Sequence, residues 1–324
     1  MSDISTHIDE IGSEFWDVPL AGENGLFPKE TEWFLSGRSA LKAILKENRF
    51  RTAAVPFWCC DSMILPFLEE GIKVVFYDEA LPQADAALVL DHFGFSSDLD
   101  TSAFSGVIIR DLTHAIFSAP KADADYYFGS MRKWAGFLTG GFAWGFKKAV
   151  AFEAEQTEFA ALRHQAMEWK ARYMRGETED KGYLAVFAKA EDMLENAGVL
   201  PAATRDVEMM KRLDASFVVA RRRENARLLL DAFSDIAVFS RLSERDCPLF
   251  VPILVPGGRR DALRRHLIGQ RIYCPVHWPI SEYHSLSAAQ RFLYDNELSL
   301  VCDQRYTSED MMRLIREIKG FLED

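Results

Sequence analysis

The chain has 324 residues, with 49 acidic and 38 basic side chains and a formal net charge of −11. This length exceeds the size at which a single hydrophobic core usually keeps growing, so it favours two packed lobes over the alternative of one large domain. The excess of acid, spread along the chain without a basic run, argues against nucleic acid as a partner.

The cysteines give no sign of a disulfide framework or of a zinc site. Cys59, Cys60, Cys247, Cys274 and Cys302 are odd in number and lack C-x-x-C spacing, so we expect reduced thiols and no metal. The N-terminus is acidic and polar where a secretory signal would be basic and then apolar, and no stretch is long enough to span a membrane. These features predict a cytoplasmic protein that does not bind membranes.

Short apolar runs in the first half of the chain are bounded by turn residues, which is typical of buried strands. They cover residues 52–57, 72–78, 86–91, 105–111, 124–129 and 140–146. Helical patterns at 39–50 and 60–71 separate the first of them. Strands that alternate with helices predict a mainly parallel sheet with helices on both faces.

The second half begins with long charged helical stretches at 152–176 and 206–233, and the arginines at 221–223 are expected on a solvent-facing side. Apolar runs and helical patterns then alternate and predict a smaller α/β lobe. They cover residues 237–242, 249–258, 260–270, 271–279, 297–306 and 308–324. We therefore expect a large domain at 20–205 and a small C-terminal domain at 206–324, linked by a long helix near 205–234.

Candidate functional residues stand directly after the apolar runs, because ligands of open α/β sheets bind beyond the carboxyl ends of the strands. Trp58, His92, Asp111 with His114, and the turn from Ser130 to Lys133 occupy these positions. Several strand ends thus bring aromatic, imidazole, acidic and amine groups to one edge of the sheet.

Together these groups suit one ligand, pyridoxal 5'-phosphate (PLP). A partly desolvated lysine such as Lys133 is a nucleophile that forms a Schiff base with an aldehyde, and an aspartate holds a pyridine nitrogen protonated. Trp58 offers a flat stacking face. The stretch "FLSGRSALKAIL" at 34–45 adds a helix start, whose backbone N–H groups favour phosphate.

Each of these residues also has a structural interpretation. The alternative for Lys133 is a surface loop, and the alternative for Asp111 is to cap a helix that starts near Thr113. The alternative for His114 and Trp58 is the core, where histidine and tryptophan are often packed with satisfied polar atoms.

The order of several stretches resembles the DegT-type aminotransferases, also called the sugar aminotransferase family, within the aspartate aminotransferase fold group. The resemblance is carried by residues 34–45, 55–78, 92–95, 111–118, 125–145, 272–279 and 298–318. It implies a fold type I PLP-dependent transferase, with a three-layer α/β/α large cofactor-binding domain and a smaller C-terminal α/β domain.

Carried over residue by residue, the resemblance makes Lys133 the Schiff-base lysine and Asp111 the partner of the pyridine nitrogen. His114 falls where the family contacts the phenolic oxygen of the cofactor, and Trp58 falls where an aromatic residue stacks on its ring. Ser39 lies in the loop that meets the phosphate.

Other positions depart from the family pattern. Ser130 matches a phosphate-binding serine of the wider fold group, whereas DegT-type sequences place theirs where this chain has Phe128. Gly37 and Arg38 belong to the phosphate loop, and Arg38 replaces a common threonine, so it either fixes an anion or pairs with a surface acid. The turn at 138–141 lacks the usual glutamate.

His92, His277 and Trp278 are candidate substrate contacts, although the prolines beside the last two also suit a structural turn. The resemblance implies transfer of an amino group from an amino acid, with glutamate first, to a keto substrate such as a nucleotide-linked keto sugar. It also implies a homodimer with sites near the subunit interface. Two alternatives stay open: a PLP-dependent lyase or dehydratase, and a non-catalytic ligand-binding relative.

Overall fold

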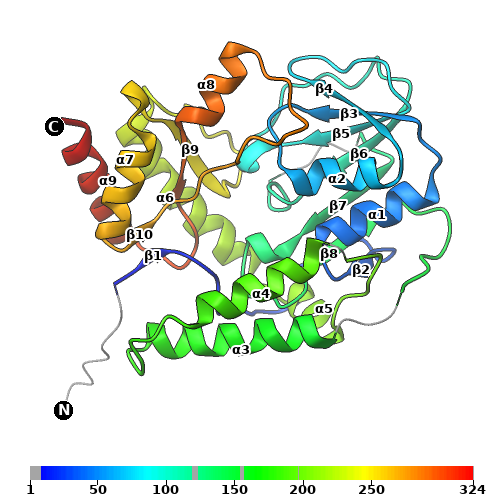
Figure 1. Ribbon diagram of the computed structural model, residues 1–324. Coiled ribbons are helices and arrows are strands. Elements are labelled where there is room, and N and C mark those ends of the chain that lie inside the picture. The colour runs from blue at the N-terminus through cyan, green and yellow to red at the C-terminus, as the bar shows by residue number, and fades with distance from the viewer. Residues whose placement is uncertain (1–8, 119–122, 154–156, 196, 324) are drawn as a thin grey trace.

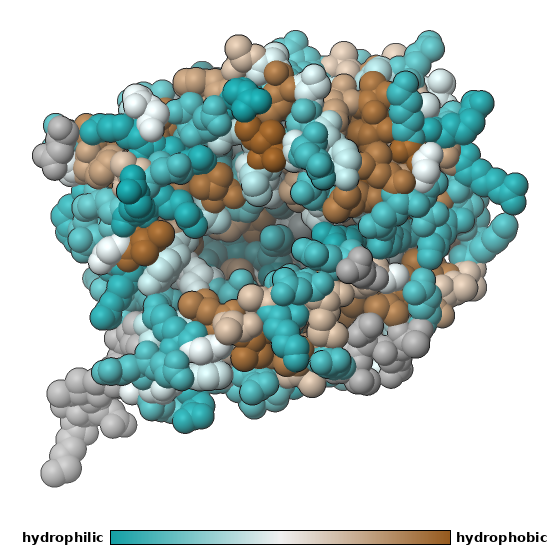
Figure 2. All heavy atoms as spheres, viewed as in Figure 1, coloured by the Kyte–Doolittle hydropathy of each residue, from teal (hydrophilic) through white to brown (hydrophobic). Residues whose placement is uncertain are grey.

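The computed structural model describes residues 9–118, 123–153, 157–195 and 197–323 (Figure 1). A large lobe holds the central sheet, and a smaller lobe is built from the C-terminal third of the chain. Figure 2, viewed from the same side as Figure 1, shows a hollow near the middle of the surface, between the two lobes. No helix in these described ranges is long and apolar enough to cross a membrane.

The central sheet has seven strands in the order β2-β8-β7-β6-β5-β3-β4. Neighbours from β7 to β4 run parallel, and only β8 runs antiparallel to its two neighbours. The strands are β2 (Glu32–Phe34), β3 (Thr52–Pro56), β4 (Lys73–Tyr77), β5 (Ala86–Leu90), β6 (Val107–Asp111), β7 (Tyr126–Ser130) and β8 (Gly141–Trp144). The predicted mainly parallel sheet is confirmed, and the carboxyl ends of β3 to β7 share one edge.

One face of the sheet is covered by α1 (Gly37–Glu47) and α2 (Asp61–Glu69). Both helices turn apolar stripes inward, so that Leu41 and Phe67 pack in one buried cluster with Leu88 of β5. Ser36 caps α1 by accepting the N–H of Ser39, which fixes where the helix begins. The start of α1 is thereby placed close to the strand ends.

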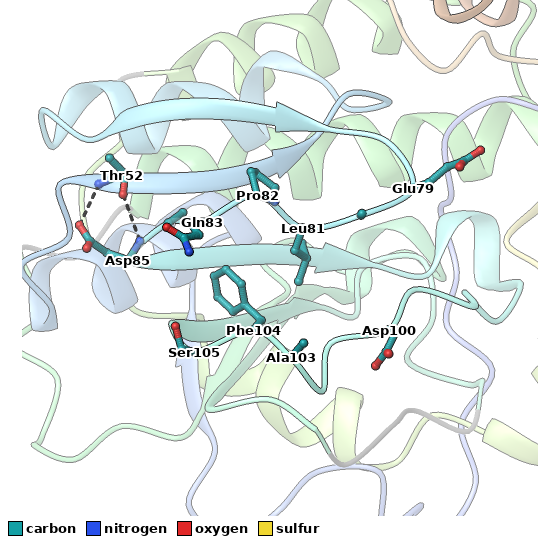
Figure 3. A pocket seen from close by; sticks show the side chains of 12 residues that line it. Thr52, Glu79, Leu81, Pro82, Gln83, Asp85, Asp100, Ala103, Phe104 and Ser105 are labelled. Carbon is teal, nitrogen blue, oxygen red and sulfur yellow. Dashed lines mark hydrogen bonds between the residues drawn. The ribbon is translucent and has the colours of Figure 1, made fainter.

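The opposite face is covered by loops as well as helices. Over β3 to β6 the cover consists of residues 78–85 and 95–106, which contain no helix, and Leu81 and Phe104 pack there against Val89. Figure 3 shows side chains from both loops around a side cavity of about 660 Å³. Among the described residues, helical cover on this face lies toward β8 and β2, where α5 (Thr204–Lys211) packs.

The small lobe surrounds the antiparallel pair of β9 (Phe250–Leu254) and β11 (Glu297–Val301). Its helices are α6 (Ala215–Phe233), α7 (Arg260–Gly269), α8 (Ala288–Asn296) and α9 (Ser308–Glu323). The expected strand at 237–242 is reduced to an isolated bridge between Ala237 and Ile253. The helical stretch at 206–233 is broken into α5 and α6, because Asp214 caps α6 by accepting the N–H of Phe217.

Helices α3 (Thr157–Met174) and α4 (Tyr183–Glu195) pack side by side below the sheet in Figure 1. The short helical turns are η1 (His92–Gly94), η2 (Met131–Lys133) and η3 (Pro256–Gly258), and β1 (Ile11–Gly12) pairs with β10 (Ile272–Tyr273) of the small lobe.

The N-terminal segment joins β10 and the α3–α4 pair. Glu10 forms ion pairs with Lys170 of α3 and with Lys181, and the first of these is fully buried. A side chain at Gly12 would place its Cβ 2.3 Å from the Tyr273 carbonyl oxygen, so only glycine fits this close approach. The segment is therefore held firmly where it reaches the space between the lobes.

Candidate active site

Lys133 stands at the end of η2, directly after β7, with an exposed side chain. The turn is anchored by Trp134, which is fully buried and whose Nε1–H donates a 2.8 Å hydrogen bond to the carbonyl of Thr113. Lys133 lines a cavity of about 290 Å³ to which both lobes and the N-terminal segment contribute. Within the described residues its amine has no hydrogen bond and no ion pair. The lysine therefore presents a free amine to a cavity.

Asp111 ends β6, the strand beside β7, so its carboxylate and the Lys133 turn come from adjacent strand ends. The carboxylate is buried, and it accepts a 2.7 Å hydrogen bond from the N–H of Thr113. Burial raises its pKa to about 6, although Thr113 and the positive charge of Lys133 partly offset this rise. A buried carboxylate whose pKa is raised in this way is characteristic of functional sites.

His114 is buried three residues beyond Asp111, and its protonation state follows from its contacts. Its Nδ1 accepts the N–H of Phe93 at 3.2 Å, so in the neutral ring the proton sits on Nε2. Burial, His277 and Lys133 hold the pKa of His114 well below its usual value. The ring is therefore neutral, and its Nε2–H is a hydrogen-bond donor.

An aromatic cluster connects these strand ends with the small lobe. Trp58, which follows β3, stacks on His92 with ring centroids 4.9 Å apart, and the Nε2–H of His92 donates to the Trp58 carbonyl at 2.8 Å. Trp278 stacks on His114 at 5.5 Å. The indole N–H of Trp58 donates to the carbonyl of His277 at 2.9 Å. The five aromatic or imidazole candidates thus meet in one region around Phe93: Trp58, His92, His114, His277 and Trp278.

The start of α1 lies against the end of β7. A Cβ placed on Gly37 would be 3.4 Å from the Cβ of Ser130, so the helix start and the residue three before Lys133 are in contact. Ser39 donates its hydroxyl to the carbonyl of Gly198 at 2.8 Å, and Arg38 donates to the carbonyl of Leu194 at 3.0 Å. Both side chains are therefore engaged, and the anion-binding groups of this helix start are its first backbone N–H groups.

Arg222 is a site residue that the sequence interpretation missed. It was expected on a solvated face, but it is fully buried in α6 and lines the Lys133 cavity. Its Nε donates to Gln304 at 2.8 Å, its guanidinium lies 4.5 Å from the centroid of the Trp134 ring, and Gln304 in turn donates to the Trp134 carbonyl. Apolar residues of α6 recur three and four positions from Arg222, a spacing that places it on the buried face.

The donor set fits PLP. A free amine suits the aldehyde, and a buried carboxylate with a raised pKa suits the pyridine nitrogen. A neutral imidazole N–H suits the phenolic oxygen, and a helix start beside Ser130 suits the phosphate. Among the described residues there is no group of three or more histidine, cysteine, aspartate or glutamate side chains able to hold a metal ion.

Comparison with known proteins gives the fold. No protein-family model and no curated protein sequence matches the chain. Similar solved structures include PseC of Helicobacter pylori, an aminotransferase involved in the biosynthesis of pseudoaminic acid, with 15% identity and a TM-score of 0.63 over 96% of this chain and 100% of PseC. The chain has the aminotransferase fold.

Two further structures support this assignment. AtS13 of Actinomadura melliaura is 14% identical, with a TM-score of 0.62 over 96% of this chain and 99% of AtS13. Spr1654 of Streptococcus pneumoniae, in its PLP-form, is 16% identical, with a TM-score of 0.60 over 90% of this chain and 87% of Spr1654. The fold predicted from the sequence is confirmed.

Proposed function

We propose that the chain is a PLP-dependent aminotransferase. The observation that carries this proposal is the free amine of Lys133, which lines the cavity and whose positive charge acts on the buried carboxylate of Asp111 at the adjacent strand end. The likeness in fold to PseC, an aminotransferase, and to Spr1654, which has been solved in a PLP-form and a PMP-form, adds support.

Each residue has a distinct role in this proposal. When bound, PLP supplies an aldehyde and an electron-withdrawing ring. Lys133 Nζ would hold the aldehyde carbon, and the same amine would move the proton at the substrate carbon that carries the amine. Asp111 would keep the pyridine nitrogen protonated, and His114 Nε2–H would donate to the phenolic oxygen. Trp58 offers a stacking face at the same site.

The phosphate would lie at the start of α1. The backbone N–H groups of Gly37 and Arg38, together with the hydroxyl of Ser130, are the groups proposed to hold it. Ser39 and the Arg38 guanidinium contribute by binding the carbonyls of Gly198 and Leu194, which holds these two residues against the helix start.

The proposed substrates are an amino acid donor, with glutamate first, and a keto acceptor such as a nucleotide-linked keto sugar. Arg264 and Arg305 line the cavity together with Lys133 and Arg222, so its wall carries several cations in a protein with a net charge of −11. A positive wall favours ligands that carry carboxylate or phosphate. His92, His277 and Trp278 are proposed to contact the substrate.

Absorbance tests the proposal directly. Titration of the wild-type protein with PLP should produce a stoichiometric visible band, and Lys133→Met should abolish it. Lys148→Met, at an exposed lysine, is the matched control and should leave it intact. A wild-type protein that stays colourless would favour the non-catalytic alternative.

Amino acids supplied one at a time to the loaded protein then separate the enzymatic alternatives. Exchange of the amine, seen as a shift of the band that a keto acid reverses, supports the aminotransferase. Release of ammonia or carbon dioxide without exchange would favour a lyase instead.

The assembly and the compartment are also proposals. A homodimer with sites near the interface rests on the family resemblance, and light scattering at a mass of two chains would support it. A cytoplasmic location is supported by the five free thiols, four of which are buried.

A further inference from the structure

Three polar side chains form a buried chain behind the cavity. Ser299 of β11 donates its hydroxyl to Oε1 of Glu297 at 2.5 Å, and its oxygen lies 2.8 Å from Nδ1 of His277. The backbone N–H of His277 donates to Oε2 of Glu297 at 2.8 Å. Glu297 and Ser299 are fully buried and His277 is 6% exposed, so the chain is shielded from bulk water.

The direction of the protons in this chain follows from the chemistry of its members. An ionised carboxylate only accepts hydrogen bonds, so Ser299 must donate its single proton to Glu297. The Ser299 oxygen can then only accept from His277, which places the imidazole proton on Nδ1. Nε2 of His277 is left with a lone pair, the opposite of the arrangement in His114.

The surroundings keep this histidine neutral. Burial, followed by the charge of Lys133, lowers the pKa of His277 to about 3. Burial raises the pKa of Glu297 to about 7, and Ser299, the His277 N–H and Arg260 of α7 act against this rise. A neutral imidazole is a weak base but a good hydrogen-bond acceptor.

One of the two carboxylates that line the cavity is already paired, and the other is exposed. His277 lines the cavity together with Lys133. Of its two carboxylates, Asp303 is already bound by both Nε and Nη2 of Arg305, and Glu14 is exposed. Nε2 of His277 makes no hydrogen bond within the described residues. Its lone pair is therefore available to accept a hydrogen bond from an amine in the cavity that Lys133 also lines.

We propose that Glu297 and Ser299 are positioning residues that fix His277 with its proton on Nδ1, and that His277 Nε2 accepts a hydrogen bond from the ammonium group of the amino donor. This assignment rests on the proposed function, and it names the group that distinguishes the amino donor from its keto product. It makes His277 a residue for recognising amines.

The tautomer is measured in cofactor-free protein labelled with 15N-histidine, at about pH 9, where Glu297 is ionised. The wild-type His277 signal, assigned by its loss in His277→Gln, should show a protonated Nδ1. In Glu297→Gln the amide would donate to Ser299, whose hydroxyl must then donate to Nδ1, so the proton should move to Nε2. Ser299→Ala should also lose the protonated Nδ1, and it serves if the first variant does not fold. Ser118→Ala, which removes another buried hydroxyl, should change nothing.

The recognition step is tested with a matched pair of ligands, L-glutamate and 2-oxoglutarate, which differ in the amine. Glutamate should shift the Nε2 signal of wild-type His277, and Glu297→Gln should weaken glutamate binding roughly tenfold while 2-oxoglutarate is unaffected. In the loaded enzyme the KM for glutamate should rise and that for 2-oxoglutarate should not.

Several results would overturn the inference. These are a wild-type proton on Nε2, no response of His277 to glutamate, or equal effects on both ligands. Failure of the proposed function would instead appear as an absence of PLP binding by the wild-type protein. The two failures are distinguishable, because the His277 tautomer and its response to glutamate are measured without the cofactor.

Discussion

Replacing Asp111 with asparagine should stabilise the cofactor-free protein at pH 8. Asparagine keeps an oxygen for the N–H of Thr113 but removes the buried charge. Burial raises the pKa of Asp111 from 3.8 to about 6. Since each pH unit corresponds to about 1.4 kcal/mol, the ionised carboxylate costs the folded state about 3 kcal/mol at pH 8.

The sign of the pH dependence follows from this rise. The folded protein holds the Asp111 proton more tightly than the unfolded chain, so the cost is absent below pH 3.8 and complete above about pH 6. The advantage of Asp111→Asn in urea unfolding should therefore be about 3 kcal/mol at pH 8 and shrink as the pH falls toward 4. Added PLP should stabilise the wild-type protein more than the variant, because only the carboxylate pairs with a protonated pyridine nitrogen.

A matched control separates this effect from the loss of any buried acid. Asp91→Asn removes a buried carboxylate that pairs with Arg110 at 3.1 Å, and it should destabilise the protein at both pH values. If Asp111→Asn is no more stable than the wild type at pH 8, the carboxylate is only a local cap, and its assignment to the cofactor is wrong.

Three further substitutions test the frame of the site in urea unfolding and PLP titration. Arg222→Met should cost roughly 3 kcal/mol and weaken PLP binding, because the brace to Trp134 through Gln304 is lost, and unchanged PLP affinity would contradict that role. Gly141→Ala should cost about 3 kcal/mol, since its Cβ would lie 2.2 Å from the Ser36 carbonyl, whereas Gly22→Ala meets nothing and should be neutral. Arg110→Met should cost about 3–5 kcal/mol by leaving Asp91 and Asp123 unpaired, yet leave PLP affinity unchanged, because the ion pairs lie under the loops away from the cavity.

The strands and the strand-end residues were predictable because the signal is local. Each apolar run of the first half forms a strand within about two residues of its expected bounds, and Asp111 and Lys133 stand at adjacent strand ends as the parallel sheet requires. Burial on both faces leaves such runs continuously apolar, which a single sequence reveals. Their roles toward PLP stay predictions.

Other features depend on contacts far apart in the sequence. Loops cover the face over β3 to β6 where helices were expected. The low helical periodicity of these loops can be interpreted only once the sheet face beneath them is known. Arg222 is buried through partners 82 residues away, and the Glu297–Ser299–His277 chain joins two segments of the small lobe. The N-terminal segment enters the cavity wall by pairing with β10, and nothing in its own residues indicates this.

Borohydride reduction of the PLP-loaded protein, followed by peptide mass mapping, tests the central claim most directly. We expect the reduced cofactor to be fixed on the peptide that contains Lys133, and Lys133→Met to abolish this adduct. An adduct confined to another lysine, or scattered over exposed lysines such as Lys148 with none on Lys133, would contradict this expectation.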